Sequence, residues 1–557
     1  MIANQVITKR WRLRPEPEAT PEGDWPSLIG RLLALRGVRS SSDARAFLDV
    51  DAPASPVALP DLDRAVSLLA QACRAGETVA VFGDFDVDGV TATALLTEGL
   101  ASLGARPIPY LPHRVDEGYG LSTKAIDTLR GLGATLLVTV DCGTSSLKEV
   151  AFARGQGMDV VVLDHHTVPP QLPGANAIVN PKRDPNSKNE PAACGIAYHV
   201  LLALHEAMAR PADEARMLEL VALGTVCDLA PMLGENRRLV RRGLEALAQT
   251  QRPGLRALLA VAGGDRGPVD TETIGFGLGP RLNAAGRLGH ARLAFDLLVC
   301  EEEERAQELA AELDALNRER RRATDAALAL AGELVAEEEG APLIMLGHPE
   351  FPLGIVGLVA ARLAEQYHRP AIIYQRGEKT SRASARSIEG FDVTAALRTC
   401  PELFVRFGGH RAAAGFTAEN EQLPAIKERL LAHAHEQLDG RELTPAIDID
   451  AELPLSALRS EEIRWLARLA PYGVGNPDPV FLSRGVVVTE RRQLGKNGDH
   501  LRLKLRDGAV VWPAIAFRQR GEGIEQGAKA DLVYTLSVDK FRGGGLELRV
   551  LDLRPVD

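Results

Sequence analysis

The sequence predicts an α/β protein with a parallel sheet in its first lobe, a long connecting helix, a second α/β lobe and a C-terminal β-barrel. Short apolar runs alternate with helical stretches from about Thr78, which is typical of strands joined by helices. Residues 291–338 lack glycine and proline up to Gly332, and residues 444–557 alternate apolar with polar side chains between glycines. A chain of 557 residues is also too long for a single hydrophobic core.

The expected strands of the first lobe are Val79–Phe82, Ile108–Leu111, Leu136–Val140 and Val160–Leu163. Residues 198–250 are predicted to be helical, and 291–338 to form a long helix that joins two lobes. The second lobe has expected strands at Leu343–Leu346 and Ala371–Tyr374. The predicted domains are an N-terminal extension that packs on the first lobe (1–55), the first lobe (56–300), the connecting helix (301–340), the second lobe (341–440) and the barrel (441–557).

Composition limits the class of protein. No window is apolar enough to span a bilayer, and the N-terminal residues lack the apolar core of a signal peptide. The six cysteines are scattered without a Cys-x-x-Cys pair, which argues against zinc ribbons and disulfide frameworks. We therefore expect a cytoplasmic monomer without a membrane partner. The formal net charge of −10 argues only weakly against nucleic acid, because local patches decide such binding.

Acidic side chains follow three of the expected strands. Asp84, Asp86 and Asp88 follow the first, Asp141 the third, and Asp164-His165-His166 the fourth. Because the carboxyl ends of parallel strands line one edge of a sheet, these groups are expected to meet there. Such dense carboxylates repel one another unless a cation lies between them, and mixed Asp and His ligands suit Mn²⁺ or Mg²⁺. A fourth contributor is Asp228, where a helical pattern ends before a proline.

These acids also have structural explanations. Taken alone, Asp141 or Asp228 is better explained as a turn residue or a helix N-cap. The Asp-x-Asp-x-Asp-Gly run also resembles the start of a calcium loop, but it lacks the glutamate needed near the end of such a loop. Taken together, the four motifs favour a metal site.

The order of these motifs resembles the DHH phosphoesterase superfamily, which builds a two-metal site from them. The resemblance implies that Asp86, Asp88, Asp141, His165 and Asp228 bind two ions, with Asp141 bridging them. It also implies that His166 faces the scissile phosphate, and that Asp164 belongs to the catalytic set. Small members of the superfamily carry a ligating histidine where this chain has Phe82, so Asp84 is expected to supply the missing oxygen.

The second lobe contains VRFGGHRAAAGF, with Gly408, Gly409 and His410. Taken by itself, this run predicts a tight glycine turn that opens a helix of small residues. A helix start of this kind with basic flanks can bind an anion through backbone N–H groups. The run also resembles the Gly-Gly-His signature of the DHH-associated domain, which implies contact with the substrate.

Basic and polar residues form further candidate phosphate contacts. They are Arg114, Arg281, Asn283, Arg287, Ser384 and Arg386. A solvated surface arginine is the plain alternative for each of them, but Ser-x-Arg-Ser in a loop combines a hydroxyl with a guanidinium group, which suits a terminal phosphate. In RecJ-type nucleases, the positions similar to Arg114, Arg281, Ser384 and Arg386 form a pocket for the 5′-phosphate. Ala383 departs from the glycine usual there.

In the last segment, alternation places Leu501, Leu503 and Leu505 on one face of a strand and Arg502, Lys504 and Arg506 on the other. The apolar face would fill a barrel and the basic face could follow a phosphate backbone, although such alternation is also common on solvated sheets. Phe517, Tyr534 and Phe541 are candidates for base stacking. The segment resembles the OB-fold that RecJ-type nucleases carry.

These resemblances imply a metal-dependent 5′→3′ exonuclease that degrades single-stranded DNA to 5′-mononucleotides in repair and recombination. They imply two Mn²⁺ or Mg²⁺ ions, and a helicase and a single-strand-binding protein as partners. Two alternatives remain at this stage. One is a phosphodiesterase for pyrophosphate, short oligonucleotides or cyclic dinucleotides, and the other is a non-catalytic single-stranded-DNA-binding relative.

Overall fold

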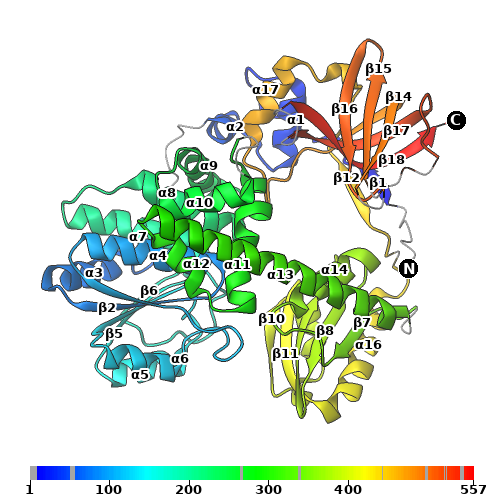
Figure 1. Ribbon diagram of the computed structural model, residues 1–557. Helices are drawn as coiled ribbons and strands as arrows, with labels where there is room; N and C mark the ends of the chain where they lie inside the picture. Colours follow the sequence, from blue (N-terminus) through cyan, green and yellow to red (C-terminus); the bar gives the residue numbers. More distant parts are fainter. Residues whose placement is uncertain are drawn as a thin grey trace.

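The computed structural model describes residues 9–49, 57–187, 189–263, 268–336, 340–441, 443–495, 498, 500–519, 521, 523–539 and 545–556. Figure 1 shows three bodies: a first lobe, a second lobe joined to it by one long helix, and a barrel that lies above both. These are the α/β lobes, helix and barrel that the sequence predicts. Within the described ranges, no helix combines the length and the apolar character needed to cross a membrane.

The first lobe is built on a parallel sheet with strand order β3-β2-β4-β5-β6. Its central strands are buried on both faces, between α3, α4 and α7 on one side and α5 and α6 on the other (Figure 1). Pro107 and Pro109 are tolerated in β3 because it is an edge strand with one partner. The bounds are β2 (Thr78–Gly83), β3 (Arg106–Tyr110), β4 (Leu136–Val140), β5 (Asp159–Leu163), β6 (Ala177–Val179), α3 (Leu62–Ala75), α4 (Val87–Ser102), α5 (Thr123–Gly131), α6 (Leu147–Gly155) and α7 (Ala193–Ala207).

Further helices complete this lobe. The segment predicted to be helical between 198 and 250 consists of three helices, because Pro211 and Pro231 lie in the connections between them. A short π-helix, η3, then leads directly into α11. The bounds are α8 (Glu214–Cys227), α9 (Gly234–Ala248), α10 (Pro253–Ala262), η3 (Thr273–Leu278), α11 (Gly279–Leu288) and α12 (Arg292–Val299).

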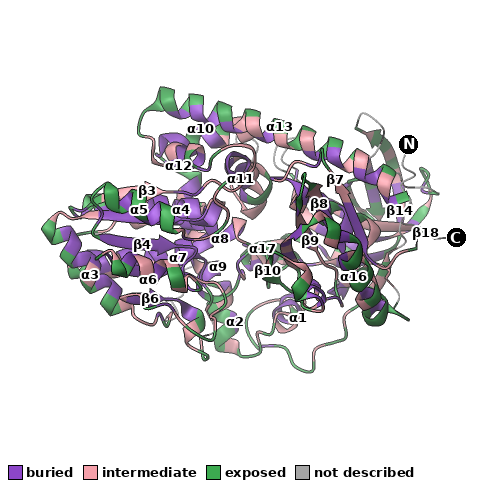
Figure 2. Cartoon of the chain, turned by 90° about the horizontal axis from the view of Figure 1, so that it is seen from below, coloured by how far each residue is buried: buried purple, intermediate pink, exposed green. Residues whose placement is uncertain are grey.

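The connecting helix α13 (Glu303–Val335) begins in the first lobe and ends against the second. Figure 2 shows its buried and exposed faces alternating along its length, as expected for an amphipathic helix. The second lobe has a five-stranded sheet with order β10-β11-β9-β8-β7. Its elements are β7 (Ile344–His348), α14 (Val356–Tyr367), β8 (Ala371–Arg376), β9 (Thr380–Arg386), α15 (Val393–Leu397), β10 (Arg406–His410), β11 (Ala413–Glu419) and α16 (Leu423–Leu438).

Two predictions for the second lobe are wrong. Gly408, Gly409 and His410 end strand β10 of a hairpin, and the alanines after them begin β11 instead of a helix. Ser384 and Arg386 lie in β9 and not in a loop. The free energy that β11 gains by pairing with β9 outweighs the local helix preference of the alanines.

The C-terminal segment forms a barrel, which closes where β14 pairs with β17. Leu501, Leu503 and Leu505 are buried inside it, as their alternation predicts. Its bounds are β12 (Ala446–Ile449), β13 (Ala451–Glu452), α17 (Ser460–Leu469), β14 (Phe481–Leu494), β15 (His500–Asp507), β16 (Val510–Ala516), β17 (Lys529–Val538) and β18 (Leu546–Val556).

The N-terminal extension does not pack mainly on the first lobe, as we expected, but on the barrel. Its strand β1 (Arg10–Leu13) pairs with β12, and its helices α1 (Ser27–Leu35) and α2 (Ser41–Leu48) share one apolar core with α17 and the barrel strands. Segments that lie far apart in sequence meet here because β12 has an open edge, and β1 pairs with that edge. Residues 1–8 and 50–55 of the extension lie outside the described residues.

Candidate metal centre and nucleotide pocket

The acidic motifs meet at one edge of the first sheet, as predicted. Asp84 follows β2, Asp141 follows β4 and Asp164 follows β5. The side chain of Asp86 caps α4, accepting hydrogen bonds from the backbone N–H groups of Asp88 and Gly89 at 3.0 and 3.2 Å. Asp228 comes to the same place from the C-terminal end of α8.

The glycine of the Asp-x-Asp-x-Asp-Gly motif has a steric reason. A Cβ atom on Gly89 would lie 2.5 Å from the backbone oxygen of Asp84, so only glycine lets the start of α4 approach the end of β2 this closely. Asp88 is then fixed by hydrogen bonds from the N–H groups of Ala193 and Cys194 at 2.7 and 2.9 Å, at the start of α7.

Ligand atoms of the acidic and histidine side chains lie close enough to hold metal ions. They form three groups, in each of which the ligand atoms lie within 4.8 Å of one another. The groups are Asp84, Asp86 and Asp141; Asp141, His165 and His166; and Asp88, His165 and Asp228. Asp141 and His165 each belong to two groups, so the three groups form one continuous cluster.

His165 lies among three carboxylates. Its Nε2 atom is 3.1 Å from Asp141 Oδ1 and 3.8 Å from Asp88 Oδ2, and its Nδ1 atom is 3.7 Å from Asp228 Oδ2. Burial lowers the pKa of His165, and the charge of Asp88 offsets this only in part, so the ring favours the neutral form that binds metals.

Burial first, and then the charges of neighbouring carboxylates, raise the pKa of several acids in the cluster. The pKa of Asp228 is raised to about 8, and those of Asp84 and Asp141 are raised well above the ordinary value. Oδ1 of Asp84 is buried without a hydrogen-bond partner. Dense carboxylates with an unsatisfied buried oxygen and neutral imidazole nitrogens fit divalent cations.

Asp164 has a different role from the other acids, because it belongs to none of the three groups. It accepts hydrogen bonds from the N–H groups of Thr144 and His165 at 2.9 and 2.8 Å, and its Oδ1 atom is 2.8 Å from His166 Nδ1. Burial raises the pKa of Asp164, but the hydrogen bond and charge of His166 outweigh it and lower the pKa. For His166, burial lowers the pKa, while the hydrogen bond and charge of Asp164 raise it overall. Asp164 therefore orients His166 as an ionised partner.

Phe82 takes no part in the cluster, because its side chain belongs to the hydrophobic core. The ring is buried and stacks on Tyr110, with centroids 5.4 Å apart and an interplanar angle of 14°. The side chain thus fills the core beside the strand, and the nearby Asp84 places a carboxylate oxygen in the cluster.

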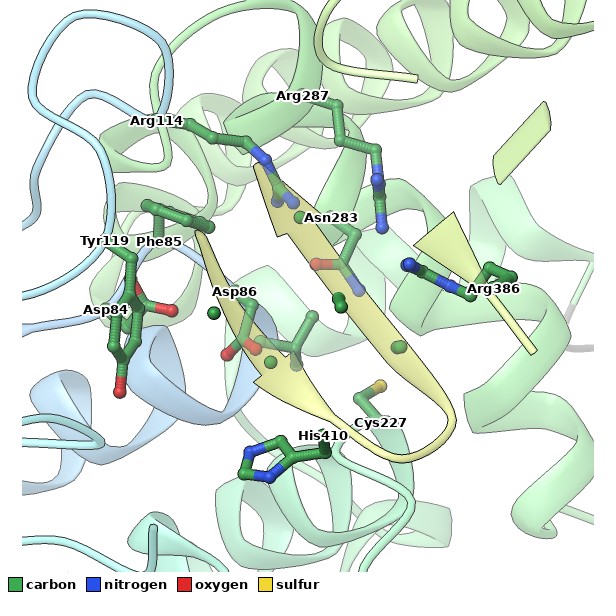
Figure 3. A pocket seen from close by; sticks show the side chains of 16 residues that line it. Asp84, Phe85, Asp86, Arg114, Tyr119, Cys227, Asn283, Arg287, Arg386 and His410 are labelled. Carbon is green, nitrogen blue, oxygen red and sulfur yellow. The ribbon is translucent and has the colours of Figure 1, made fainter. Parts of the chain in front are cut away.

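A cavity of about 520 Å³ opens beside this cluster and lies between the two lobes. Figure 3 shows Asp84 and Asp86 at one end of it and Arg287 and Arg386 at the other. The predicted substrate residues that line it are Arg114, Asn283, Arg287, Arg386, Gly408, Gly409 and His410. Residues of both lobes are therefore needed to complete it.

Three arginines converge on this cavity in spite of their mutual repulsion. Burial, and then the charges of Arg114, Arg320 and Arg386, lower the pKa of Arg287 to about 9. Burial and the charge of Arg114 also lower the pKa of Arg386. The guanidinium group of Arg114 lies 4.5 Å from the centre of the Phe85 ring. A partly buried cluster of like charges is stabilised by a bound anion, and a phosphate group fits it.

Arg281 is one of two predicted substrate residues, with Ser384, that lie outside the cavity lining. Asn283 and Arg287 are one helical turn apart on α11 and face the cavity, whereas Arg281 lies on the opposite side of that helix. Its guanidinium group contacts Asp314 of α13 at 2.9 Å and the backbone oxygen of Gly277 at 2.7 Å. Arg281 therefore stabilises the junction of the helices.

Ser384 acts through its neighbour. It is outside the cavity lining, and its Oγ atom accepts a hydrogen bond of 3.0 Å from Arg386 Nη1. Alternation along β9 places the two side chains on the same face of the strand. Gly357 of α14 leaves room for both, since a Cβ atom there would lie 3.0 Å from Ser384 Oγ and 3.1 Å from Arg386 Nη2.

Several residues that line the cavity were not predicted from the sequence, among them Phe85, Tyr119 and Cys227. A signal was available for two of them. Phe85 lies inside the acidic motif, and Tyr119 stands between two glycines directly after Arg114 and its acidic loop. Cys227 precedes Asp228 at the end of a largely apolar helical run, which gave no separate signal.

The outer face of the barrel is less basic than its sequence suggests. Arg502 pairs with Glu547 at 3.3 Å, and Lys504 pairs with Glu490 at 2.6 Å. Of the predicted stacking residues, Tyr534 is fully buried and hydrogen-bonds with Ser483, so it belongs to the core. Phe517 is 44 % exposed, and Phe541 lies outside the described residues.

Three family models match the chain: the DHH family N-terminal domain over residues 78–225, the DHHA1 domain over 340–436 and the RecJ OB domain over 449–552. The single-stranded-DNA-specific exonuclease RecJ of Salmonella typhimurium is 36 % identical, over 98 % of this chain and 99 % of its own length. The enzyme of the same name from Bacillus subtilis is 34 % identical, over 97 % of this chain and 70 % of its own length. The crystal structure of Thermus thermophilus RecJ in complex with Mn²⁺ has a TM-score of 0.83 and 32 % identity, covering 98 % of this chain and 80 % of that one.

Proposed function

The chain belongs to the RecJ family of DHH phosphoesterases, and from this membership we propose that it is a metal-dependent 5′→3′ exonuclease for single-stranded DNA. The observation that carries the proposal is the cavity that has a carboxylate and histidine cluster at one end and buried arginines at the other. Metal-assisted hydrolysis of a phosphodiester needs both kinds of group.

The metal ligands of this proposal are Asp84, Asp86, Asp88, Asp141, His165 and Asp228, for two Mn²⁺ or Mg²⁺ ions. When bound, the ions supply an activated water and polarise the scissile phosphate. Asp164 holds His166 by the 2.8 Å hydrogen bond, so that its protonated ring can donate to a phosphate oxygen. His410 contributes from the second lobe and lines the same cavity.

The geometry also supports the polarity of the reaction. A cavity of about 520 Å³ suits one nucleotide. Arg114, Arg287 and Arg386 would bind the terminal 5′-phosphate, while the next phosphate reaches the metal ligands at the other end. Hydrolysis there releases a 5′-mononucleotide and leaves a new 5′-phosphate on the remaining strand.

Other parts of the proposal concern the setting of the enzyme. Because the proposed enzyme degrades single strands, we propose that it acts in DNA repair and recombination. A helicase would expose the strand, and a single-strand-binding protein would hold it. We propose that the protein is a monomer located in the cytoplasm. The six cysteines, which are free in the structure, agree with that location.

The test is digestion of a long single strand labelled at its 5′ or 3′ end, in parallel with duplex DNA and dinucleotides, with Mn²⁺, Mg²⁺ or EDTA. We expect mononucleotides to be released first from the 5′ end of the single strand, and only with a metal ion. The Asp141→Ala variant should lose nearly all of this activity while it remains folded. Preferred cleavage of dinucleotides, or full activity of that variant, would contradict the proposal.

A further inference from the structure

Tyr119 occupies an unusual place between the cavity and the metal cluster. It lies in the loop between β3 and α5, and it is flanked by Gly118 with φ 82° and Gly120 with φ 90°. Residues other than glycine rarely adopt such angles, so the two glycines turn the chain on both sides of the tyrosine. Tyr119 is 53 % exposed and lines the cavity, in contrast to most large side chains of this lobe.

The hydroxyl group of Tyr119 reaches the metal cluster. It donates a hydrogen bond of 3.2 Å to the backbone oxygen of Asp141, the residue shared by two ligand groups. Asp141 has φ 61°, a left-handed conformation that costs free energy in residues other than glycine. A hydrogen bond to its carbonyl group therefore helps to hold the strained residue in the geometry that presents its carboxylate.

The same side chain lies against His166. The two rings are tilted by 59° with centroids 5.6 Å apart, and the tyrosine oxygen is 3.3 and 3.5 Å from the two ring nitrogens. The hydroxyl is thus nearly equidistant from the two ring nitrogens, and Asp164 Oδ1 lies 2.8 Å from Nδ1 of the same ring. Contacts with both Asp164 and Tyr119 therefore restrict the ring.

Figure 3 shows the Tyr119 ring beside Asp84, at the end of the cavity away from Arg287 and Arg386. A nucleotide whose 5′-phosphate lies at the arginines would therefore place its scissile end next to this ring. An exposed aromatic ring offers a sugar or a base a face without sequence preference.

We propose that Tyr119 is a positioning residue for hydrolysis, whose ring holds the nucleotide beside the scissile phosphate and whose hydroxyl holds Asp141 and His166 in place. This inference rests on the proposed exonuclease function and deepens it. It assigns two separable tasks to one side chain, so two substitutions can separate them.

The experiment compares Tyr119→Phe with Tyr119→Ala, using steady-state kinetics on a 5′-phosphorylated single strand with Mn²⁺. Tyr119→Phe removes only the hydroxyl, so we expect kcat to fall about tenfold, as for the loss of one hydrogen bond, with KM nearly unchanged. Tyr119→Ala also removes the ring, so KM should in addition rise several-fold.

The matched control is Tyr110→Phe, which removes a hydroxyl from the same region, where Tyr110 donates to Glu117 at 2.7 Å, outside the cavity lining. It should leave kcat and KM within about twofold. Wild-type kinetics in both Tyr119 variants would overturn the inference, as would equal losses in the control. Absence of single-strand exonuclease activity in the wild type would instead overturn the proposed function.

Discussion

At the scale of single residues, the site depends on charges that would repel one another in the absence of a ligand. The acidic cluster concentrates carboxylates with raised pKa values, and the cavity ends in arginines with lowered pKa values. Each half is therefore prepared for a partner of the opposite sign, the first for cations and the second for phosphate. This arrangement leads to predictions about individual side chains.

The first concerns pH and metal binding. Because burial and the charges of Asp88 and Asp86 raise the pKa of Asp228 to about 8, its metal-free carboxyl group holds a proton at neutral pH that an ion must displace. Mn²⁺ should therefore bind more tightly at about pH 8.5 than at about pH 6.5, with release of protons. Calorimetric titrations in buffers of different ionisation enthalpy measure both effects, and equal affinity at the two pH values would contradict the explanation.

The same shift sets the pH dependence of stability. The folded-state pKa of Asp228 lies above its unfolded value of about 3.9, so the stabilisation from its protonated form is complete below that value. It is lost as the pH rises from about 4 through about 8. Bound Mn²⁺ removes this loss, so the increase in melting temperature that it causes should be larger at about pH 8.5 than at about pH 6.5.

The second prediction separates two arginines that resemble each other in the sequence. Arg386→Ala removes a guanidinium group from the phosphate site. It should therefore abolish most of the preference for a 5′-phosphorylated end over a 5′-hydroxyl end, while Mn²⁺ affinity changes little. Arg281→Ala should lower the free energy of unfolding, because it breaks the contact with Asp314, and should leave the end preference intact. Competition between the two kinds of oligonucleotide end measures the preference. An unchanged preference in Arg386→Ala would refute the proposed phosphate site.

At the scale of elements, the short hairpin of β10 and β11 brings the second lobe to the site. Its glycines and alanines leave the backbone close to the cavity, which larger side chains would fill. Gly409 has φ 145°, and a Cβ atom there would lie 2.4 Å from the Cα atom of Ala414. A Cβ atom on Gly408, by contrast, would meet no other atom within 4 Å.

Substitutions at these two glycines test the hairpin geometry. Gly409→Ala should cost about 1–3 kcal/mol of stability, because it forces both strain and a clash, and should lower kcat/KM by displacing His410. Gly408→Ala should change the free energy of unfolding by no more than about 0.5 kcal/mol. Chemical denaturation of both variants decides the matter, and equal stabilities would argue against the described turn.

At the scale of the whole molecule, the barrel and the N-terminal extension attach to the first lobe around Arg237 of α9. This buried side chain donates to the backbone oxygens of Arg468, Pro471 and Phe47 at 2.9, 3.2 and 3.2 Å. Burial and the charge of Arg241 lower its pKa to about 9, and its guanidinium group also lies over the Phe47 ring. One side chain thus joins three parts of the chain that are distant in sequence.

Arg237→Ala should therefore loosen the barrel from the first lobe. Buried carbonyl groups left without donors cost about 1–3 kcal/mol each, so we expect at least about 2 kcal/mol of lost stability and a separate unfolding step for the barrel. The control is Arg256→Ala, which breaks an exposed ion pair with Glu303 and should cost less than about 1 kcal/mol. Urea unfolding followed by fluorescence, together with limited proteolysis, would show the lost stability and the separate unfolding step. Equal losses of stability in the two variants would contradict the role of Arg237.

The sequence by itself determined the chemistry of the site. Neighbouring parallel strands that end in acids bring those acids together, so Asp84, Asp141 and the Asp164-His165-His166 run could be placed from the sequence alone. Leu501, Leu503 and Leu505 likewise follow from the two-residue period of a strand. Such features depend on neighbours in sequence and on one rule of topology.

Only the tertiary structure decided which basic residues share the cavity, where the hairpin lies and what the N-terminal extension covers. Arg281 and Arg287 stand in one motif, yet the helix turns them to opposite sides. The alanines after His410 favour a helix locally, but pairing with β9 makes them a strand. These outcomes depend on contacts between distant segments, whose free energy exceeds the local preferences, and a single sequence does not reveal those contacts.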